Sequence, residues 1–178
     1  MRLLSQAGYI DAKFMGSKEV NTKKIDQRPF LPDIRVWRTA NEYQEAASIC
    51  DERKHYWAGA ILAALAIEIY LKSFLSEEVE VFSNGTKRIY KRTERGHNLE
   101  TLYKKIPQWM IDIILRESKL LNPKINLEKE FIENKYTFEM ARYLHEKDAV
   151  NSISNSIIRL AEHMRELVIK VAAHTHPD

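Results

Sequence analysis

The sequence predicts one predominantly α-helical domain, an up-and-down bundle of about five to six helices with a small β-hairpin insertion. Three observations predict this all-α class. The 178 residues are enough to bury a core and fit a single domain. Five Gly and five Pro are too few for a sandwich or barrel, which needs a turn every ~8–12 residues. Apolar residues also recur at helical spacing in several long segments.

Residues 1–36 lack a helical period, and Pro29 and Pro32 favour extended backbone before them. We therefore predict an extended N-terminal arm over 1–36 and a helical domain over 37–178. Thr39 is the expected N-cap of the first helix, over 39–54, with Glu42 as its capping-box partner.

The segment 56–76 is the clearest helix, and its residues 60–67 are apolar on every face. Such a helix is either central or membrane-spanning, and spanning needs ~20 uninterrupted apolar residues. Glu68 and Lys72 interrupt the run, so we predict a central helix and no membrane partner. Isolated buried charge is costly, so this i,i+4 pair either forms the floor of a polar groove or is a structural pair at the core edge.

A β-hairpin is predicted over 79–91, because Asn84-Gly85 suits a type I′ turn. Its second half is basic, and this run could hold phosphate or form a solvated rim. The basic residues are Lys87, Arg88, Lys91, Arg92 and Arg95.

Four more helices complete the prediction. Asn98 is the expected cap of a helix reaching residue 105, and Pro107 ends it and starts another over 108–121, with Trp109 as a core candidate. Helices over 127–144 and 148–173 follow, the second with an apolar stripe at 3–4 spacing.

Two groups of residues are candidates for catalysis or anion binding. His97 precedes a helix N-terminus, where it could act as a base or help bind an anion, or could merely cap the turn; Arg92 lies upstream. The helix 127–144 would present a polar strip of Lys135, Tyr136, Glu139, Arg142 and His145, in which Lys135 and Glu139 would form an i,i+4 pair. Lys135 and Arg142 could hold a phosphodiester with His145 as acid or base, although ordinary surface ion pairs would produce the same strip.

The last helix places four polar residues on one face, namely Ser152, Ser156, Arg159 and His163. This polar face could be functional, but Ser and Asn are also commonly enriched near the start of a helix. The single Cys50 excludes an internal disulfide and a Cys-based zinc site, and fits a reducing compartment, most simply the cytoplasm. We expect no metal and no cofactor. The net charge of +3 does not by itself indicate a nucleic-acid partner.

In combination, four segments resemble the HEPN domain superfamily of prokaryotes. Their order is an Ala-rich helix ending in Glu–x3–Lys, a Gly-His-Asn-Leu helix start, and an aromatic and charged helix. The segments are 43–47 (YQEAA), 63–75 (AALAIEIYLKSFL), 96–103 (GHNLETLY) and 131–139 (FIENKYTFE).

The resemblance implies a bundle of four to five helices that is usually dimeric. Many members are RNases of toxin–antitoxin, abortive-infection or CRISPR-linked defence; others bind RNA or nucleotide, or pair with a small nucleotidyltransferase. Nuclease members carry Arg and His separated by four to six residues near the start of the last helix. Here two residues separate Arg142 from His145, whereas the four between Arg92 and His97 lie elsewhere in the chain.

The leading hypothesis is a homodimeric HEPN-like protein of a prokaryotic defence or stress system. It would bind RNA or a nucleotide in a groove near Lys72, His97, Lys135 and Arg142. Further binding candidates are Glu68, Asn98, Tyr136 and Glu139. In the enzymatic version, a metal-independent endoribonuclease, His97 or His145 would be the acid or base, and Arg92 or Arg142 would stabilise the developing phosphorane. The alternative is a non-catalytic interaction module for a cognate antitoxin or nucleotidyltransferase.

Overall fold

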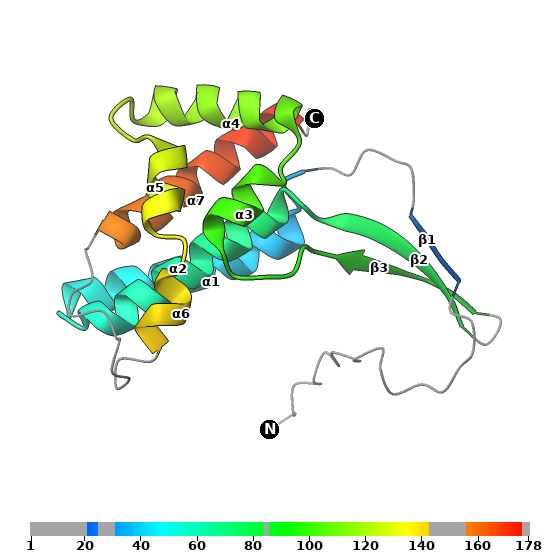
Figure 1. Ribbon diagram of the computed structural model, residues 1–178, viewed down its shortest axis with the longest axis horizontal. Helices are drawn as coiled ribbons and strands as arrows, with labels where there is room; N and C mark the ends of the chain where they lie inside the picture. Colours follow the sequence, from blue (N-terminus) through cyan, green and yellow to red (C-terminus); the bar gives the residue numbers. More distant parts are fainter. Residues whose placement is uncertain (1–20, 25–30, 84–85, 143–155, 176–178) are drawn as a thin grey trace.

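A computed structural model describes residues 21–24, 31–83, 86–142 and 156–175. Figure 1 shows a body of packed helices from which a narrow β-sheet projects. In these ranges the order is β1, α1, α2, β2, β3, α3, α4, α5, α6 and α7. The predicted class, a helical bundle with a β-hairpin insertion, is confirmed.

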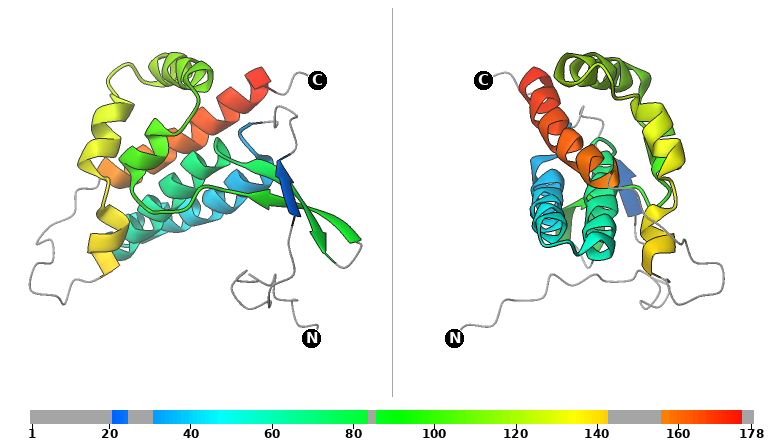
Figure 2. Two further views of the ribbon diagram at one scale, coloured as in Figure 1. Left: turned by 45° about the vertical axis from the view of Figure 1, so that its right-hand side comes forward. Right: turned by 90° about the vertical axis from the view of Figure 1, so that its left-hand side faces the viewer.

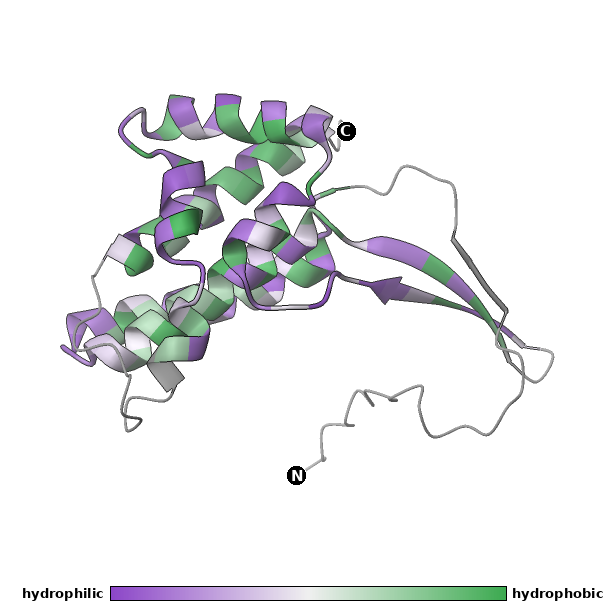
Figure 3. Ribbon diagram, in the orientation of Figure 1, coloured by the Kyte–Doolittle hydropathy of each residue, from purple (hydrophilic) through white to green (hydrophobic). Residues whose placement is uncertain are grey.

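The centre of the body is α2 (Tyr56–Ser73), which packs against both α1 (Ile34–Glu52) and α7 (Ser156–Thr175), as two views in Figure 2 show. By length and composition alone α2 could cross a membrane, but more than half of it is buried inside the protein. In Figure 3 hydrophobic colour runs along most of α2, whereas α4 alternates between the two colours. The predicted central position is therefore confirmed, and packing explains why α2 is apolar on all faces.

A close contact at Gly59 brings the central helices together. A Cβ built there would lie 3.2 Å from the Ala47 carbonyl oxygen and 3.2 Å from the Ile158 side chain. Both neighbouring helices thus approach α2 at a position without a side chain, and the small residues Ala60, Ala63 and Ala64 continue the buried contact.

The predicted start of the first helix is wrong. The helix α1 begins at Ile34, and its N-cap is Asp33, whose Oδ1 accepts a hydrogen bond from the Arg35 N–H at 3.0 Å. Thr39 lies within the helix and is exposed. Asp and Thr are both good caps by type, but Asp33 is also held by Ser76 Oγ (3.2 Å), a contact between distant segments.

The hairpin is confirmed and is slightly longer than predicted, with β2 (Glu77–Ser83) antiparallel to β3 (Thr86–Arg92). A third strand, β1 (Asn21–Lys24), pairs with β2 inside the segment predicted to be an extended arm. The sheet order is β1-β2-β3, so β3 has a strand neighbour on only one side among the described strands.

The helices α3 (Leu99–Lys104) and α4 (Gln108–Leu121) follow the prediction closely. On α4, however, Trp109 is 49% exposed, and the neighbouring Met110 is buried in its place. Pro107 fixes the start of α4, but the orientation of its apolar face depends on the packing against α7.

The single helix predicted over 127–144 is wrong, because two short helices occupy this segment, α5 (Leu127–Glu133) and α6 (Thr137–Arg142). Asn134 ends α5, and its Nδ2 donates to the Glu130 carbonyl at 2.9 Å. Asn side chains compete in this way for backbone groups and favour a turn over continued helix. Residues 148–155 of the last predicted helix lie outside the described residues.

Candidate functional site

The buried carboxylate of Glu68 joins α2 to the loop that precedes α3. Its Oε1 lies 2.7 Å from Lys72 Nζ, and its Oε2 lies 2.8 Å from His97 Nδ1. The side chain of Glu68 is 3% exposed, that of Lys72 17% and that of His97 45%. Glu68 and Lys72, which were expected as an i,i+4 pair, and His97, which was expected near the same groove, therefore form one hydrogen-bonded cluster, from buried Glu68 to exposed His97.

Local backbone features place His97 at this position. Gly96 has a φ of +104°, a left-handed conformation that suits glycine and allows the chain to turn from β3 towards α3. On the other side, Asn98 Oδ1 accepts a hydrogen bond from the Thr101 N–H at 2.9 Å and caps α3. The Phe138 ring lies 5.1 Å from the imidazole, between centroids, so the His97 ring is held by a carboxylate and an aromatic neighbour.

The hydrogen bond to Glu68 determines what His97 can do chemically. An ionised carboxylate only accepts, so Nδ1 of His97 carries the hydrogen and donates it. In the neutral ring Nε2 is then a proton acceptor, and no described residue forms a hydrogen bond with it. The ring is partly exposed, so Nε2 is suited to take a proton from a bound ligand while Glu68 stabilises the resulting imidazolium.

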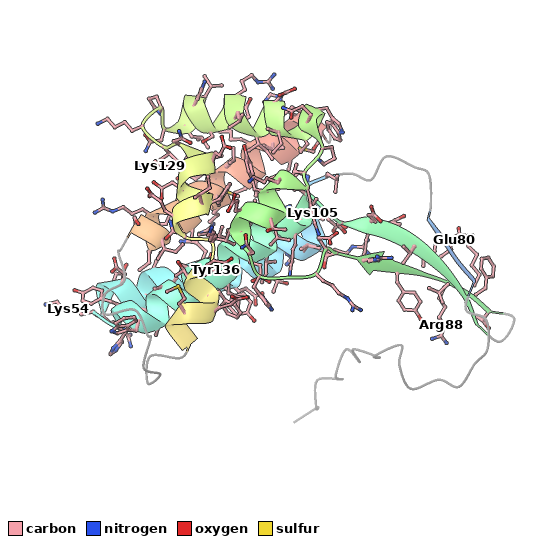
Figure 4. All side chains as sticks on the ribbon, in the orientation of Figure 1. Lys54, Glu80, Arg88, Lys105, Lys129 and Tyr136 are labelled. Atoms are coloured by element: carbon pink, nitrogen blue, oxygen red, sulfur yellow. The ribbon has the colours of Figure 1, made fainter. Side chains whose placement is uncertain are left out.

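Two of the other predicted binding residues, Lys135 and Tyr136, have structural partners. Lys135 and Tyr136 lie in the turn between α5 and α6, where Lys135 Nζ lies 3.5 Å from Glu100 Oε2 and 5.3 Å from the Tyr136 ring centroid. The predicted i,i+4 pair of Lys135 with Glu139 is wrong, because the helix is broken between them. Glu139 is on α6 and half-buried. In Figure 4 Tyr136 is labelled at the turn between α5 and α6.

Of the two predicted catalytic arginines, only Arg92 has a described side chain, and it is not among the described partners of Glu68. Arg92 is exposed at the end of β3, and its positive charge makes a small contribution to lowering the pKa of Glu94, which is lowered mainly by the hydrogen bond from Lys105. Arg142 is the last residue of α6, and its side chain lies outside the described part of the structure. His145 also lies outside the described residues.

The two lysines near His97 are compensated by carboxylates. Lys72 faces Glu68, and Lys135 faces Glu100, whose pKa is lowered mainly by a hydrogen bond from Lys104. A phosphate group bound here would compete with these carboxylates for the lysines. The arrangement thus suits proton transfer by His97 better than strong anion binding.

A second polar pair was missed by the sequence analysis. Ser118 Oγ on α4 lies 2.8 Å from His163 Nε2 on α7, and both residues are buried. His163 also borders a cavity of about 700 Å³, together with Arg159, Ser156 and Glu130. Three of the predicted polar residues of the last helix thus do share a cavity, but Ser118 is 45 positions away from His163 and no spacing could have revealed it.

Burial lowers the pKa of His163 below its ordinary value of 6.5, so at a given pH near that value it binds less proton in the folded protein than in the unfolded chain. The unfolded chain therefore binds more protons than the folded protein as the pH falls below about 6.5, and stability declines over that interval. We expect His163→Gln, which can still hydrogen-bond Ser118, to flatten this decline in urea-unfolding midpoints measured against pH. The exposed His55→Gln is the control. An equally steep decline in His163→Gln would contradict the assignment.

Within the described residues, no three His, Cys, Asp or Glu side chains converge as a metal site would require. Comparisons of the chain with protein-family models, with curated proteins and with solved structures gave no significant match. The HEPN resemblance therefore remains a hypothesis based on the four sequence segments, and the site has to be judged by its own geometry.

Proposed function

We propose that this chain is a HEPN-like RNA-binding protein in which His97 acts as the acid–base group of a metal-independent endoribonuclease. The observation that supports the proposal is the 2.8 Å contact between buried Glu68 Oε2 and His97 Nδ1, which leaves Nε2 of a partly exposed ring as the base. A carboxylate that orients a histidine in this way is a recurrent arrangement for proton transfer.

In the proposed reaction Nε2 of His97 takes the proton of an RNA 2′-hydroxyl. The 2′-oxygen attacks the adjacent phosphorus, and the bond from phosphorus to the 5′-oxygen breaks. The products are a 2′,3′-cyclic phosphate and a 5′-hydroxyl, whose proton comes from the imidazolium or from water. Glu68 stabilises the imidazolium through the Nδ1 hydrogen bond.

The sequence resemblance supports a further proposal about the assembly and the biological role of this protein. We propose a homodimer acting in a prokaryotic defence or stress system, because the Ala-rich helix with Glu68 and Lys72, and the Gly96-His97-Asn98 helix start, are the segments that resemble the superfamily. Sedimentation of the purified chain tests the dimer independently of any activity.

His97→Ala is expected to reduce cleavage of a single-stranded RNA by about 10²–10⁴-fold with EDTA present, the usual range for removing a general acid or base. His55→Ala is the matched control, because His55 is exposed and its side chain makes no capping hydrogen bond. Product ends are identified by mass spectrometry. Undiminished cleavage by a folded His97→Ala variant would overturn the proposed mechanism.

The compensated charges support a second candidate, a non-catalytic module that binds a protein partner of the antitoxin or nucleotidyltransferase type. Exposed apolar side chains on α5, the following turn and α6 would suit such a partner: Ile132, Tyr136 and Met140. RNA binding that weakens steeply with salt favours the first function. Absence of RNA binding, with capture of a partner that Ile132→Glu abolishes, favours the second.

A further inference from the structure

Pairing in the hairpin separates its basic residues onto two faces of the sheet. Residues directly opposite each other in an antiparallel pair share a face, and alternate residues along a strand share it too. Lys91 lies opposite Glu78, and Lys87 lies opposite Phe82. Arg88, Tyr90 and Arg92 alternate with them and belong to the other face, opposite Val81, Val79 and Glu77.

The face that carries Lys87 and Lys91, which we call the lysine face, stabilises the structure through ion pairs. Lys87 Nζ lies 2.5 Å from Glu80 Oε1. Lys91 Nζ lies 2.7 Å from Asp33 Oδ2 and 3.0 Å from Glu78 Oε1, and Asp33 is only 4% exposed. These contacts neutralise both lysines, and Lys91 fastens the sheet to the start of α1.

The other face, which we call the arginine–tyrosine face, consists of Arg88, Tyr90 and Arg92. All three are exposed, Tyr90 by 47%. Arg88 forms no ion pair with any residue in the described ranges, and its cross-strand neighbour is the apolar Val81. Arg92 lies opposite Glu77 and near the charge of Glu94, so Arg88 is the less compensated cation. In Figure 4 Arg88 and Glu80 lie on opposite sides of the hairpin.

The chemistry of this face specifies its ligand. Alternate residues on a strand are about 6.6 Å apart, so Tyr90 occupies the position between Arg88 and Arg92 on this face. Guanidinium groups bind phosphate oxygens in bidentate fashion, and a tyrosine ring stacks on any base that is not already stacked in a duplex. An acidic peptide would satisfy the arginines but would leave the exposed ring unexplained.

We propose that the arginine–tyrosine face binds single-stranded nucleic acid, with Arg88 and Arg92 on phosphates and Tyr90 stacked on a base. This goes beyond the proposed function, because the surface lies on the projecting hairpin (Figure 1) and binding there does not involve His97. Stacking and phosphate contacts do not distinguish ribose from deoxyribose. Short single strands of RNA and of DNA are therefore both expected to bind.

The test is fluorescence anisotropy of the full chain with labelled oligouridine, oligothymidine and a duplex, over a series of salt concentrations. Tyr90→Ala is expected to weaken binding of both single strands about 5- to 150-fold, as loss of one base–aromatic stack does, whereas Tyr90→Phe keeps the affinity. Arg88→Ala is expected to weaken binding and to reduce the slope of log affinity against log salt by about 0.7.

Lys87→Ala is the matched control, since it removes the same charge from the neighbouring position on the opposite face, and it is expected to bind nearly as the parent does. Equal losses in Lys87→Ala and Arg88→Ala would show diffuse charge attraction and overturn the proposal. Duplex binding as tight as single-strand binding, or unchanged affinity in Tyr90→Ala, would overturn it too. Binding lost in His97→Ala but kept in Arg88→Ala would place the ligand at the other site, whereas loss of cleavage alone bears only on the proposed function.

Discussion

Glu68→Gln is expected to lower the free energy of unfolding by about 3 kcal/mol, the lower end of the range for breaking a buried ion pair. The carboxylate is almost fully buried and accepts from both Lys72 and His97. An amide removes the charge that compensates Lys72, which is only 17% exposed and cannot recover full hydration. Chemical denaturation monitored by circular dichroism measures the loss.

The double variant Glu68→Gln/Lys72→Met separates stability from chemistry. Replacing both charges by groups of similar size is often close to neutral, so most of the lost stability should return. The stabilisation of the His97 imidazolium should not return, because the acceptor for its Nδ1 hydrogen is still a neutral amide, and cleavage should stay low. If Glu68→Gln unfolded at the same denaturant concentration as the parent, the cluster would not contribute to stability.

Asp33→Ala is expected to cost about 3 kcal/mol, the sum of a lost N-cap of ~1 kcal/mol and lost hydrogen bonds to a charged group. Asp33 accepts from the Arg35 N–H, Ser76 Oγ and Lys91 Nζ. It therefore connects the start of α1, the chain after α2, and β3. We expect the variant to unfold at lower denaturant concentration and its hairpin amides to exchange faster with solvent.

The dependence of stability on acid pH provides the control for the role of Asp33. Burial by itself would raise the pKa of Asp33, but hydrogen bonds from Lys91 and the Arg35 N–H lower it below its ordinary value of 3.8. The folded protein thus binds fewer protons than the unfolded chain near this pH, so the contribution is present above 3.8 and is lost as the pH falls through the lowered pKa. Asp33→Asn keeps a capping oxygen, so it should cost less than Ala and should lose this acid dependence. An unchanged acid limb in Asp33→Asn would contradict the assignment.

The helical part of the fold could be predicted from sequence because its signals are local. Residues 60–67 are apolar on all sides, Asn98 caps α3 where expected, and β2 pairs with β3 on either side of the predicted Asn84-Gly85 turn. Local signals failed where two choices were close in energy. Thr39 is a plausible N-cap by residue type, but Asp33, which has partners in distant segments, caps α1 instead. Asn134 ends α5, although the apolar spacing continues past it.

The candidate site was only half predictable. Glu68, Lys72 and His97 were each recognised from sequence, Glu68 as a charge in an apolar run and His97 as a residue before a helix start. Nothing in their spacing showed that Glu68 and His97, 29 residues apart, would be hydrogen-bonded to each other. Lys135 was expected beside Glu139, and the broken helix placed it beside Glu100 instead.

By itself, then, the sequence determined the helical class, the central position of α2, the hairpin, and the presence of charged residues within the apolar run of α2. Those properties follow from periodicity, capping and turn preference within a few neighbouring residues. Only the tertiary structure decided which polar and charged side chains face each other. It paired Glu68 with His97, Ser118 with His163 and Asp33 with Lys91, and it left Arg88 exposed and without an ion pair among the described residues. Such choices depend on which distant segments become neighbours when the apolar faces are buried, and that packing is not encoded in any short stretch of the chain.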